Sequence, residues 1–191
     1  MINRALVSLM IIILSGCSTM DINEYKDNSP EFVLEDYFSG RTVAHGVFEN
    51  RSGEVIKQFK VTLNGHVEDN VLILEEDFVY MDGKLDKRLW HINILPDGHY
   101  EGTTNGVIGV ARGQRAGNAF HWTYVFDLPV KNTSYKLKFD DWMFLQEDGV
   151  MINRAHVTKW GFKVGSVTLS FYKEDGLKTS STSSLKLINA S

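Results

Sequence analysis

The stretch AFHWTYVFDL, residues 119–128, alternates between large apolar side chains and a mixture of small, polar and charged ones. Successive side chains of a β-strand point to opposite faces, so this period of two predicts a strand. The apolar face of the strand is made of Phe120, Trp122, Tyr124, Phe126 and Leu128. We therefore expect a long strand here that presents five large side chains on one face.

The same alternation recurs along the chain and is interrupted by turn signals. Residues 72–80 place Glu76 on the same face as four large apolar residues, and residues 166–171 alternate serine or threonine with apolar side chains. Turn sequences separate such runs: RSG at 51–53, DG at 82–83, PDG at 96–98 and EDG at 147–149. About eight to ten strands at this spacing predict an all-β antiparallel sandwich or barrel. A closed barrel is favoured because so many strands leave edges that must be paired.

One segment before these strands has a different pattern. Residues 30–38 begin with Pro30 and are followed by Gly40, which are start and stop signals of a helix. We expect a short N-terminal helix that leads into the barrel.

The first residues predict export. An apolar run at residues 5–14 follows Arg4, which is typical of a secretory signal and too short to span a bilayer. The run ends in Leu14-Ser15-Gly16-Cys17, which resembles the bacterial lipobox. That resemblance implies that residues 1–16 are a signal peptide, that Cys17 carries a thioether lipid, and that the new N-terminus is acylated with a chain such as palmitate. The alternative is an ordinary signal peptide followed by an incidental buried cysteine.

The residues around the lipobox suggest a location and a domain plan. Ser18 follows the cysteine, which by resemblance to lipoprotein sorting in Gram-negative cells implies an outer-membrane anchor facing the periplasm. Residues 17–31 are polar and without period, so we interpret them as the lipidated cysteine and a flexible tether. The barrel is then expected at residues 32–177, and the low-complexity tail at 178–191 is expected to be disordered.

Length and charge narrow the classes of function. The chain has 191 residues, which suits a single domain, and its formal net charge is −4. This mild acidity argues against nucleic acid as a partner and against binding of anionic lipid through a polybasic segment. The membrane is thus expected as a partner only through the lipid anchor, and the sequence leaves the oligomeric state open.

No catalytic or metal-binding motif is recognisable. The sequence lacks G-x-S-x-G, H-E-x-x-H, G-x-G-x-x-G and G-K-[ST], and its six histidines show no metal-ligand spacing. Two carboxylates of the run Glu75-Glu76-Asp77 could serve a glycosidase, but a solvated strand end is the more ordinary interpretation. We therefore expect no enzyme, no catalytic residues, no metal and no cofactor other than the covalent lipid.

Adjacent aspartates, Asp140 and Asp141, interrupt the next alternating run. Neighbouring side chains on a strand point to opposite faces, so one aspartate should point inward and need a partner. Asn153 and Arg154, which lie across the turn at 147–149, could supply that partner. A buried network that fixes the hairpin register is favoured over a ligand site.

Several of these stretches together resemble a known family. They are FSGRTVAHGVFENRSG, GNAFHWTY, LPV, FDDWM and NRA with KWGFKVG, and they occur in order between about Phe32 and Phe171. This set is similar to an uncharacterised family of proteobacterial lipoproteins with a domain of unknown function. The resemblance implies a lipocalin-like β-barrel in the cell envelope and no established activity.

We therefore predict a non-enzymatic, outer-membrane-tethered barrel that binds or carries a lipid or another apolar molecule. Ligand pockets of this kind are mostly apolar with a few fixed polar groups. The candidate lining residues are Trp90, Trp122, Tyr124, Trp142 and Trp160, with Asp141 and Arg154 as polar contacts. The alternative is that the aromatic residues fill a solid core, which would leave a structural or protein-binding envelope lipoprotein.

Overall fold

The computed structural model describes residues 20–130 and 133–174. Ten strands make up most of this part: β1 (Gly40–Asn50), β2 (Val55–Glu68), β3 (Val71–Tyr80), β4 (Leu85–Ile94), β5 (His99–Thr103), β6 (Val107–Ala116), β7 (Ala119–Val130), β8 (Thr133–Leu145), β9 (Met151–Lys159) and β10 (Phe162–Lys173). Three short helical turns accompany them: η2 (Ile22–Tyr25), α2 (Leu34–Phe38) and η3 (Pro96–Gly98).

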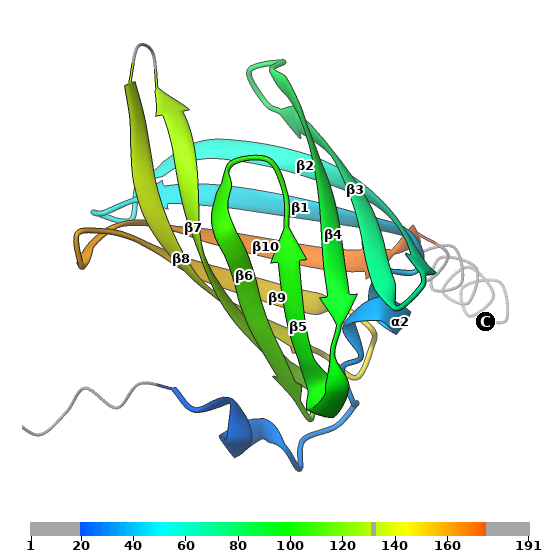
Figure 1. Cartoon of the computed structure of the whole chain (residues 1–191). Helices are drawn as coiled ribbons and strands as arrows, with labels where there is room; N and C mark the ends of the chain where they lie inside the picture. The colour runs from blue at the N-terminus through cyan, green and yellow to red at the C-terminus, as the bar shows by residue number, and fades with distance from the viewer. Residues whose placement is uncertain (1–19, 131–132, 175–191) are drawn as a thin grey trace, which may run out of the picture.

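The ten strands form one closed antiparallel barrel (Figure 1). Each strand pairs with the next along the chain, and β1 pairs with β10 to close the sheet. Closure leaves no strand edge unpaired, which is the reason a barrel was favoured over a sandwich. The predicted all-β antiparallel barrel and its short N-terminal helix, α2, are confirmed.

All four turn sequences connect strands as predicted. The first, second and fourth close the β1–β2, β3–β4 and β8–β9 hairpins, and the third forms η3 before β5. A fifth hairpin, β2–β3, turns at Asp69 and Asn70, which both have positive φ. Aspartate and asparagine tolerate this conformation, so a two-residue turn forms here without glycine.

Strand β7 presents its aromatic face to the barrel interior. Phe120 and Trp122 are buried there, and they pack with residues of the other strands into one core. Other strands contribute their alternate residues in the same way, for example Leu72 and Leu74 of β3 and Phe171 of β10. The period of two in the sequence therefore specified which side chains face inward.

The segment around α2 closes one end of the barrel (Figure 1). Phe32 and Phe38 are almost fully buried in the core, and their rings lie edge-on to Phe120 and Phe171 at centroid distances of 6.3 and 5.7 Å. A Cβ atom at Gly65 would overlap the carbonyl group of Phe38, so glycine lets the segment pass close to β2. The α2 segment is thus packed closely against β2 and the core.

The segment before α2 differs from the expected flexible tether. Residues 20–31 lie against the outside of the barrel, where Ile22 is buried against Ala119 and Trp142. The ring of Tyr25 lies 5.9 Å from that of Trp142, and the Phe32 amide donates a 2.8 Å hydrogen bond to the Gly117 carbonyl. The tether prediction is wrong for these residues, because two apolar side chains three positions apart suffice to dock a single helical turn.

The other predicted segments lie largely outside the described residues. These are the signal peptide at 1–16, the lipidation site Cys17 and the tail at 178–191, all of which remain predictions. Within residues 20–130 and 133–174, no helix is long and apolar enough to cross a membrane.

Candidate functional site

A cavity of about 380 Å³ lies inside the barrel. Its wall is mostly apolar and aromatic, and its lining includes Ile56, Lys57 and Tyr80, which lie at the end of the barrel opposite α2. The cavity therefore opens at that end, between the hairpin turns, while the α2 segment seals the other. Its volume lies within the range of about 300–1,000 Å³ typical of small-molecule sites.

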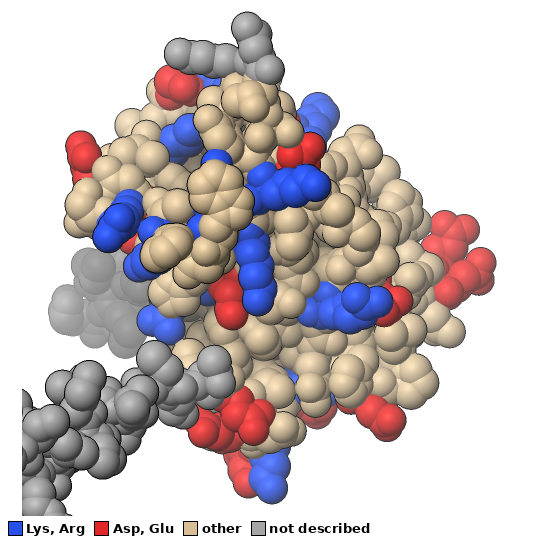
Figure 2. Space-filling view, turned by 60° about the vertical axis from the view of Figure 1, so that its left-hand side comes forward, with Lys and Arg blue, Asp and Glu red and all other residues tan. Residues whose placement is uncertain are grey.

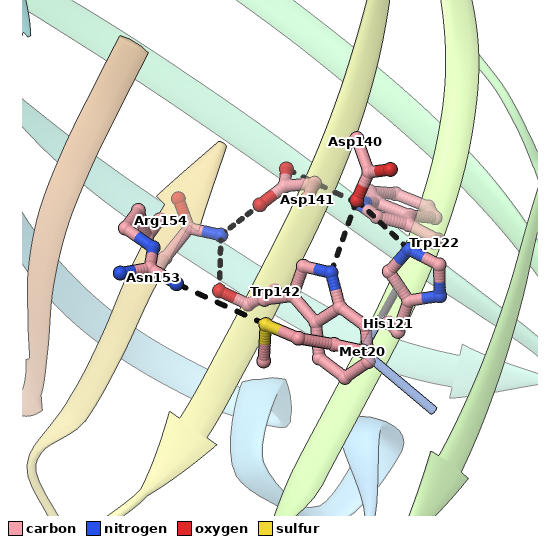
Figure 3. Close-up of polar contacts among 8 residues, drawn as sticks. All are labelled: Met20, His121, Trp122, Asp140, Asp141, Trp142, Asn153 and Arg154. Atoms are coloured by element: carbon pink, nitrogen blue, oxygen red, sulfur yellow. Dashed lines mark hydrogen bonds and ion pairs between the residues drawn. The ribbon is translucent and has the colours of Figure 1, made fainter. Parts of the chain in front are cut away.

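A polar cluster lies deep in this cavity (Figure 3). Asp141 of β8 is 7% exposed and sits directly opposite Trp122 of β7, whose indole Nε1 donates a 3.2 Å hydrogen bond to its carboxylate. Asn153 of β9 donates a second hydrogen bond to the same carboxylate through Nδ2. That amide nitrogen lies 3.4 Å from the carbonyl oxygen of Trp142, which holds it in place. Three adjacent strands thus fix a buried carboxylate.

Burial changes the protonation of Asp141. Removal from water raises the pKa of Asp141 to about 6, and the charge of Asp140 adds to this effect. The hydrogen bonds from Asn153 and Trp122 favour the charged form and oppose the rise. The carboxyl group therefore titrates near the pH range of living cells rather than near its ordinary value of 3.8.

A second carboxylate reaches the cavity from the opposite wall. Glu76 of β3 is paired in register with Arg88 of β4, and Arg88 Nη1 lies 3.9 Å from Glu76 Oε2. Burial raises the pKa of Glu76, while the charge of Arg88 and a hydrogen bond from Trp90 lower it. The charge of Asp141 raises the Glu76 pKa further, so the two carboxylates interact electrostatically.

Aromatic rings surround these charges. The Arg88 guanidinium lies over the Phe78 and Phe126 rings at 4.8 and 5.2 Å from their centroids. Trp90 packs against Trp122 with ring centroids 4.8 Å apart, and burial raises the pKa of Tyr124. The cavity thus holds two acidic groups, two basic groups (Arg88 and, at the mouth, Lys57) and several faces of aromatic rings.

Asp140 has a separate environment on the outside of the barrel. Its Oδ1 atom lies 3.0 Å from His121 Nε2 and accepts a 3.0 Å hydrogen bond from Trp142 Nε1. The rings of His121 and Trp142 are stacked at 4.1 Å. The two aspartates therefore point to opposite faces, as the alternation predicted.

Four of the seven residues predicted to contact a ligand lie in the cavity lining, and three do not. Those in the lining are Trp90, Trp122, Tyr124 and Asp141. Trp142 is buried on the outside beneath Ile22, Arg154 is exposed with Nη2 4.0 Å from Met20 Sδ, and Trp160 is 86% exposed in the β9–β10 turn.

The proposed partnership of Arg154 with Asp141 is wrong, and that of Asn153 is confirmed. In the β8–β9 ladder Arg154 pairs with Trp142 and Ala155 pairs with Asp141. Odd-numbered residues of β9 therefore face inward with Asp141, and Arg154 faces outward. The sequence offered both candidates, and only the register of the two strands distinguishes them.

Sequence reasoning missed Glu76 and Arg88 as interior residues. Glu76 shares a face with Leu72, Leu74 and Phe78, so the alternation already placed it inside, but the acidic run around it was interpreted as a solvated strand end. Arg88 has the same parity on its strand as Trp90, which is buried. On each of two consecutive strands, a charged residue shares the face of large apolar residues. This pattern was the signal that could have identified both residues as interior.

Among the residues that the structure describes, no group of three or more His, Cys, Asp or Glu side chains is placed to hold a metal ion. Likewise, no serine, threonine, histidine or cysteine occurs among the described residues that line the cavity. Its polar groups are carboxylates, an amide, a guanidinium, an amine, indole N–H groups and phenols. What the arrangement offers is a concave apolar surface with fixed hydrogen-bond acceptors and donors.

These features define a closed antiparallel β-barrel with an internal cavity that has a polar cluster. Residues 11–173 match a family model described as "Protein of unknown function (DUF3833)". The chain belongs to this family, which confirms the expectation of a domain of unknown function with a barrel fold. A comparison with curated proteins finds no match.

Proposed function

We propose that this protein is an outer-membrane lipoprotein whose barrel binds an apolar or amphipathic molecule without chemical conversion. The observation that carries the binding role is the cavity of about 380 Å³, lined by aromatic residues and open at one end. A solid core, which the structural alternative requires, would leave no such volume. The absence of a serine, threonine, cysteine or histidine side chain among the described lining residues favours binding over catalysis.

The polar cluster indicates which end of an amphipathic ligand lies deep in the barrel. An ionised carboxylate has about four acceptor sites, and Asp141 uses two of them for Asn153 and Trp122. Glu76 adds a second carboxylate beside Arg88, and the other cation of the lining, Lys57, lies at the mouth. A ligand group that donates hydrogen bonds, such as an alcohol or an ammonium group, fits the two carboxylates at the deep end better than a carboxylate does.

Native mass spectrometry tests the binding role. A chain that begins at Ser18 keeps every contact described for residues 20–174, so it can be incubated with envelope lipid extract and then with dodecylamine, dodecanol or dodecanoic acid. We expect one bound molecule per chain from the extract, and retention of the amine and the alcohol in preference to the acid. A chain that retains none of these would contradict the binding role, and preference for the acid would contradict the assignment of the polar end.

The anchor rests on the lipobox and is tested separately. Metabolic labelling of the full chain with a fatty-acid analogue in a Gram-negative host should label the wild type. We expect the Cys17→Ala variant to remain unlabelled and unprocessed, because the later steps need the modified thiol. Continued labelling of this variant would rule out Cys17 as the lipidation site.

A further inference from the structure

The β9–β10 turn exposes two large aromatic side chains. Trp160 is 86% exposed and Phe162 is 75% exposed. Trp160 also has a φ of 52°, in the left-handed region, and Gly161 follows with a φ of 83°. A two-residue turn of this kind favours asparagine, aspartate or glycine, so neither packing nor turn geometry accounts for a tryptophan there. An exposed aromatic pair of this kind marks an interaction surface.

Lysines surround this aromatic pair. Within residues 133–138 and 158–166 there are four basic residues and no acidic residue. Together with three aromatic residues they form what we call the basic tip: Tyr135, Lys136, Lys138, Lys159, Trp160, Phe162 and Lys163. The Lys159 ammonium lies 3.6 Å from the Tyr135 ring centroid and 4.5 Å from that of Trp160.

The basic tip is built on neighbouring strands. β8 and β9 pair up to Lys138 and Thr158, and Phe162 of β10 pairs with Lys159. Figure 2 views the molecule from the side on which the β9–β10 turn projects, and several Lys and Arg side chains lie there among uncharged ones, with Asp and Glu side chains between them. Basic and apolar groups therefore lie together on one exposed face.

The basic tip also lies beside the cavity mouth. Leu128, which lines the cavity, pairs directly with Tyr135. The docked N-terminal segment begins on the same wall, since Met20 lies against Arg154 of β9. Lys159 lies five positions along the strand from Arg154, which corresponds to about 17 Å. The mouth, the basic tip and the start of the described chain thus share one side of the barrel.

We propose that the basic tip docks the mouth of the barrel on an anionic lipid bilayer. Exposed tryptophan and phenylalanine insert at the level of the lipid headgroups, and lysines bind the lipid phosphates while their alkyl stems lie along the apolar surface. The chain as a whole is acidic, but charges farther apart than about 8–10 Å are largely screened at physiological salt. The four lysines of the basic tip outnumber the two acidic residues paired with these segments, Asp127 opposite Lys136 and Glu49 opposite Ser166, so an excess of positive charge remains at this face.

Vesicle binding tests this docking surface. The chain that begins at Ser18 has no lipid anchor, so its binding to phosphatidylcholine vesicles with and without phosphatidylglycerol reports on the protein surface alone. We expect binding that requires phosphatidylglycerol and weakens with salt. Lys159→Gln and Lys163→Gln should each weaken binding about fivefold. Trp160→Ser combined with Phe162→Ser should abolish it.

Matched controls remove similar groups elsewhere on the surface. Lys26→Gln with Lys60→Gln removes two exposed lysines outside the basic tip, and Val67→Ser with Leu95→Ser removes two exposed apolar side chains near the other end of the barrel. Both control variants should bind vesicles as the wild type does. Wild-type protein that does not bind phosphatidylglycerol vesicles would overturn the proposal, and so would tip variants that bind like the controls.

Two further readouts separate this proposal from its competitors. Sedimentation of the wild type without vesicles should show a monomer, whereas a dimer that the tip substitutions dissociate would assign the surface to a second copy of the chain and overturn membrane docking. The tip variants should still retain dodecylamine in native mass spectra. A wild type that binds phosphatidylglycerol vesicles but retains no ligand would contradict the proposed function and leave the docking surface standing.

Discussion

The two ends of the barrel use similar residue types in opposite ways. At the end closed by α2, the large side chains of Phe32, Phe38 and Phe120 are at most 3% exposed. At the open end, those of Trp160 and Phe162 are at least 75% exposed. Phenylalanine thus occurs at both ends, sealed into the core at one and presented to the surroundings at the other.

This difference indicates that the two ends of one sheet have different roles. The hydrogen-bonded ladder continues around the whole barrel, so the closure of the sheet does not depend on what packs at either end. Packing around α2 supplies stability at the closed end, and this leaves the exposed side chains at the mouth available for the binding that we propose. Substitutions at the two ends should therefore separate stability from function.

The largest expected effect lies at the closed end. Phe32→Ala removes a fully buried ring and should lower the free energy of unfolding by about 3–5 kcal/mol. Phe162→Ala makes the same chemical change at an exposed site and should alter the free energy of unfolding by less than about 0.5 kcal/mol. Urea denaturation of both variants measures the contrast. Equal losses would show that the two ends do not differ in the way described.

The next effect concerns the cavity between the ends and depends on pH. The pKa of Asp141 is about 6 in the folded protein against an ordinary value of 3.8, so the folded state holds this proton more tightly than the unfolded state. Its contribution to stability is therefore present below about pH 4 and is lost as the pH rises through about 6. The difference corresponds to about 3 kcal/mol.

Asp141→Asn tests this effect, because asparagine keeps the shape of the side chain and does not ionise. Relative to wild type, the free energy of unfolding of the variant should rise by about 3 kcal/mol between about pH 4 and pH 7. Urea denaturation at several pH values measures this difference. A constant difference across that range would show that the Asp141 carboxyl does not titrate there.

A smaller contrast compares the inner and outer faces of β9. Asn153→Ala removes a hydrogen bond to a buried carboxylate and should cost about 1.5–3 kcal/mol at neutral pH. Arg154→Ala, one position along the strand, removes an exposed side chain and should cost less than about 0.5 kcal/mol. Thermal melts of the two variants give the comparison. A larger loss for Arg154→Ala would reinstate Arg154 as a buried partner.

Much of the fold follows from local patterns in the sequence. The period of two between residues 119 and 128 placed five side chains on one face, and glycine-containing turns marked four of the connections. What the patterns did not reveal is the docking of residues 20–31. That segment buries only a few side chains, and their partners Ala119 and Trp142 lie about a hundred positions away in the sequence.

The candidate site was predictable only in part, for a related reason. Alternation along a strand identifies the inward face, so Trp90, Trp122 and Tyr124 could be selected from sequence. It does not align one strand with the next, and a shift of one residue exchanges Asn153 for Arg154 as the neighbour of Asp141. Partners across strands, and with them the polar cluster, therefore required the register that the structure supplies.

The most direct test of the central claim, that the cavity is a binding site, is to fill it. Ala155 is buried and lines the cavity, so Ala155→Phe places a ring in the space, while Ser170→Phe adds the same ring at an exposed position. Both variants can be titrated with the neutral fluorescent probe N-phenyl-1-naphthylamine after circular dichroism has shown wild-type strand content. We predict that the wild type and Ser170→Phe bind the probe and that Ala155→Phe does not. Equal binding by all three would contradict the account.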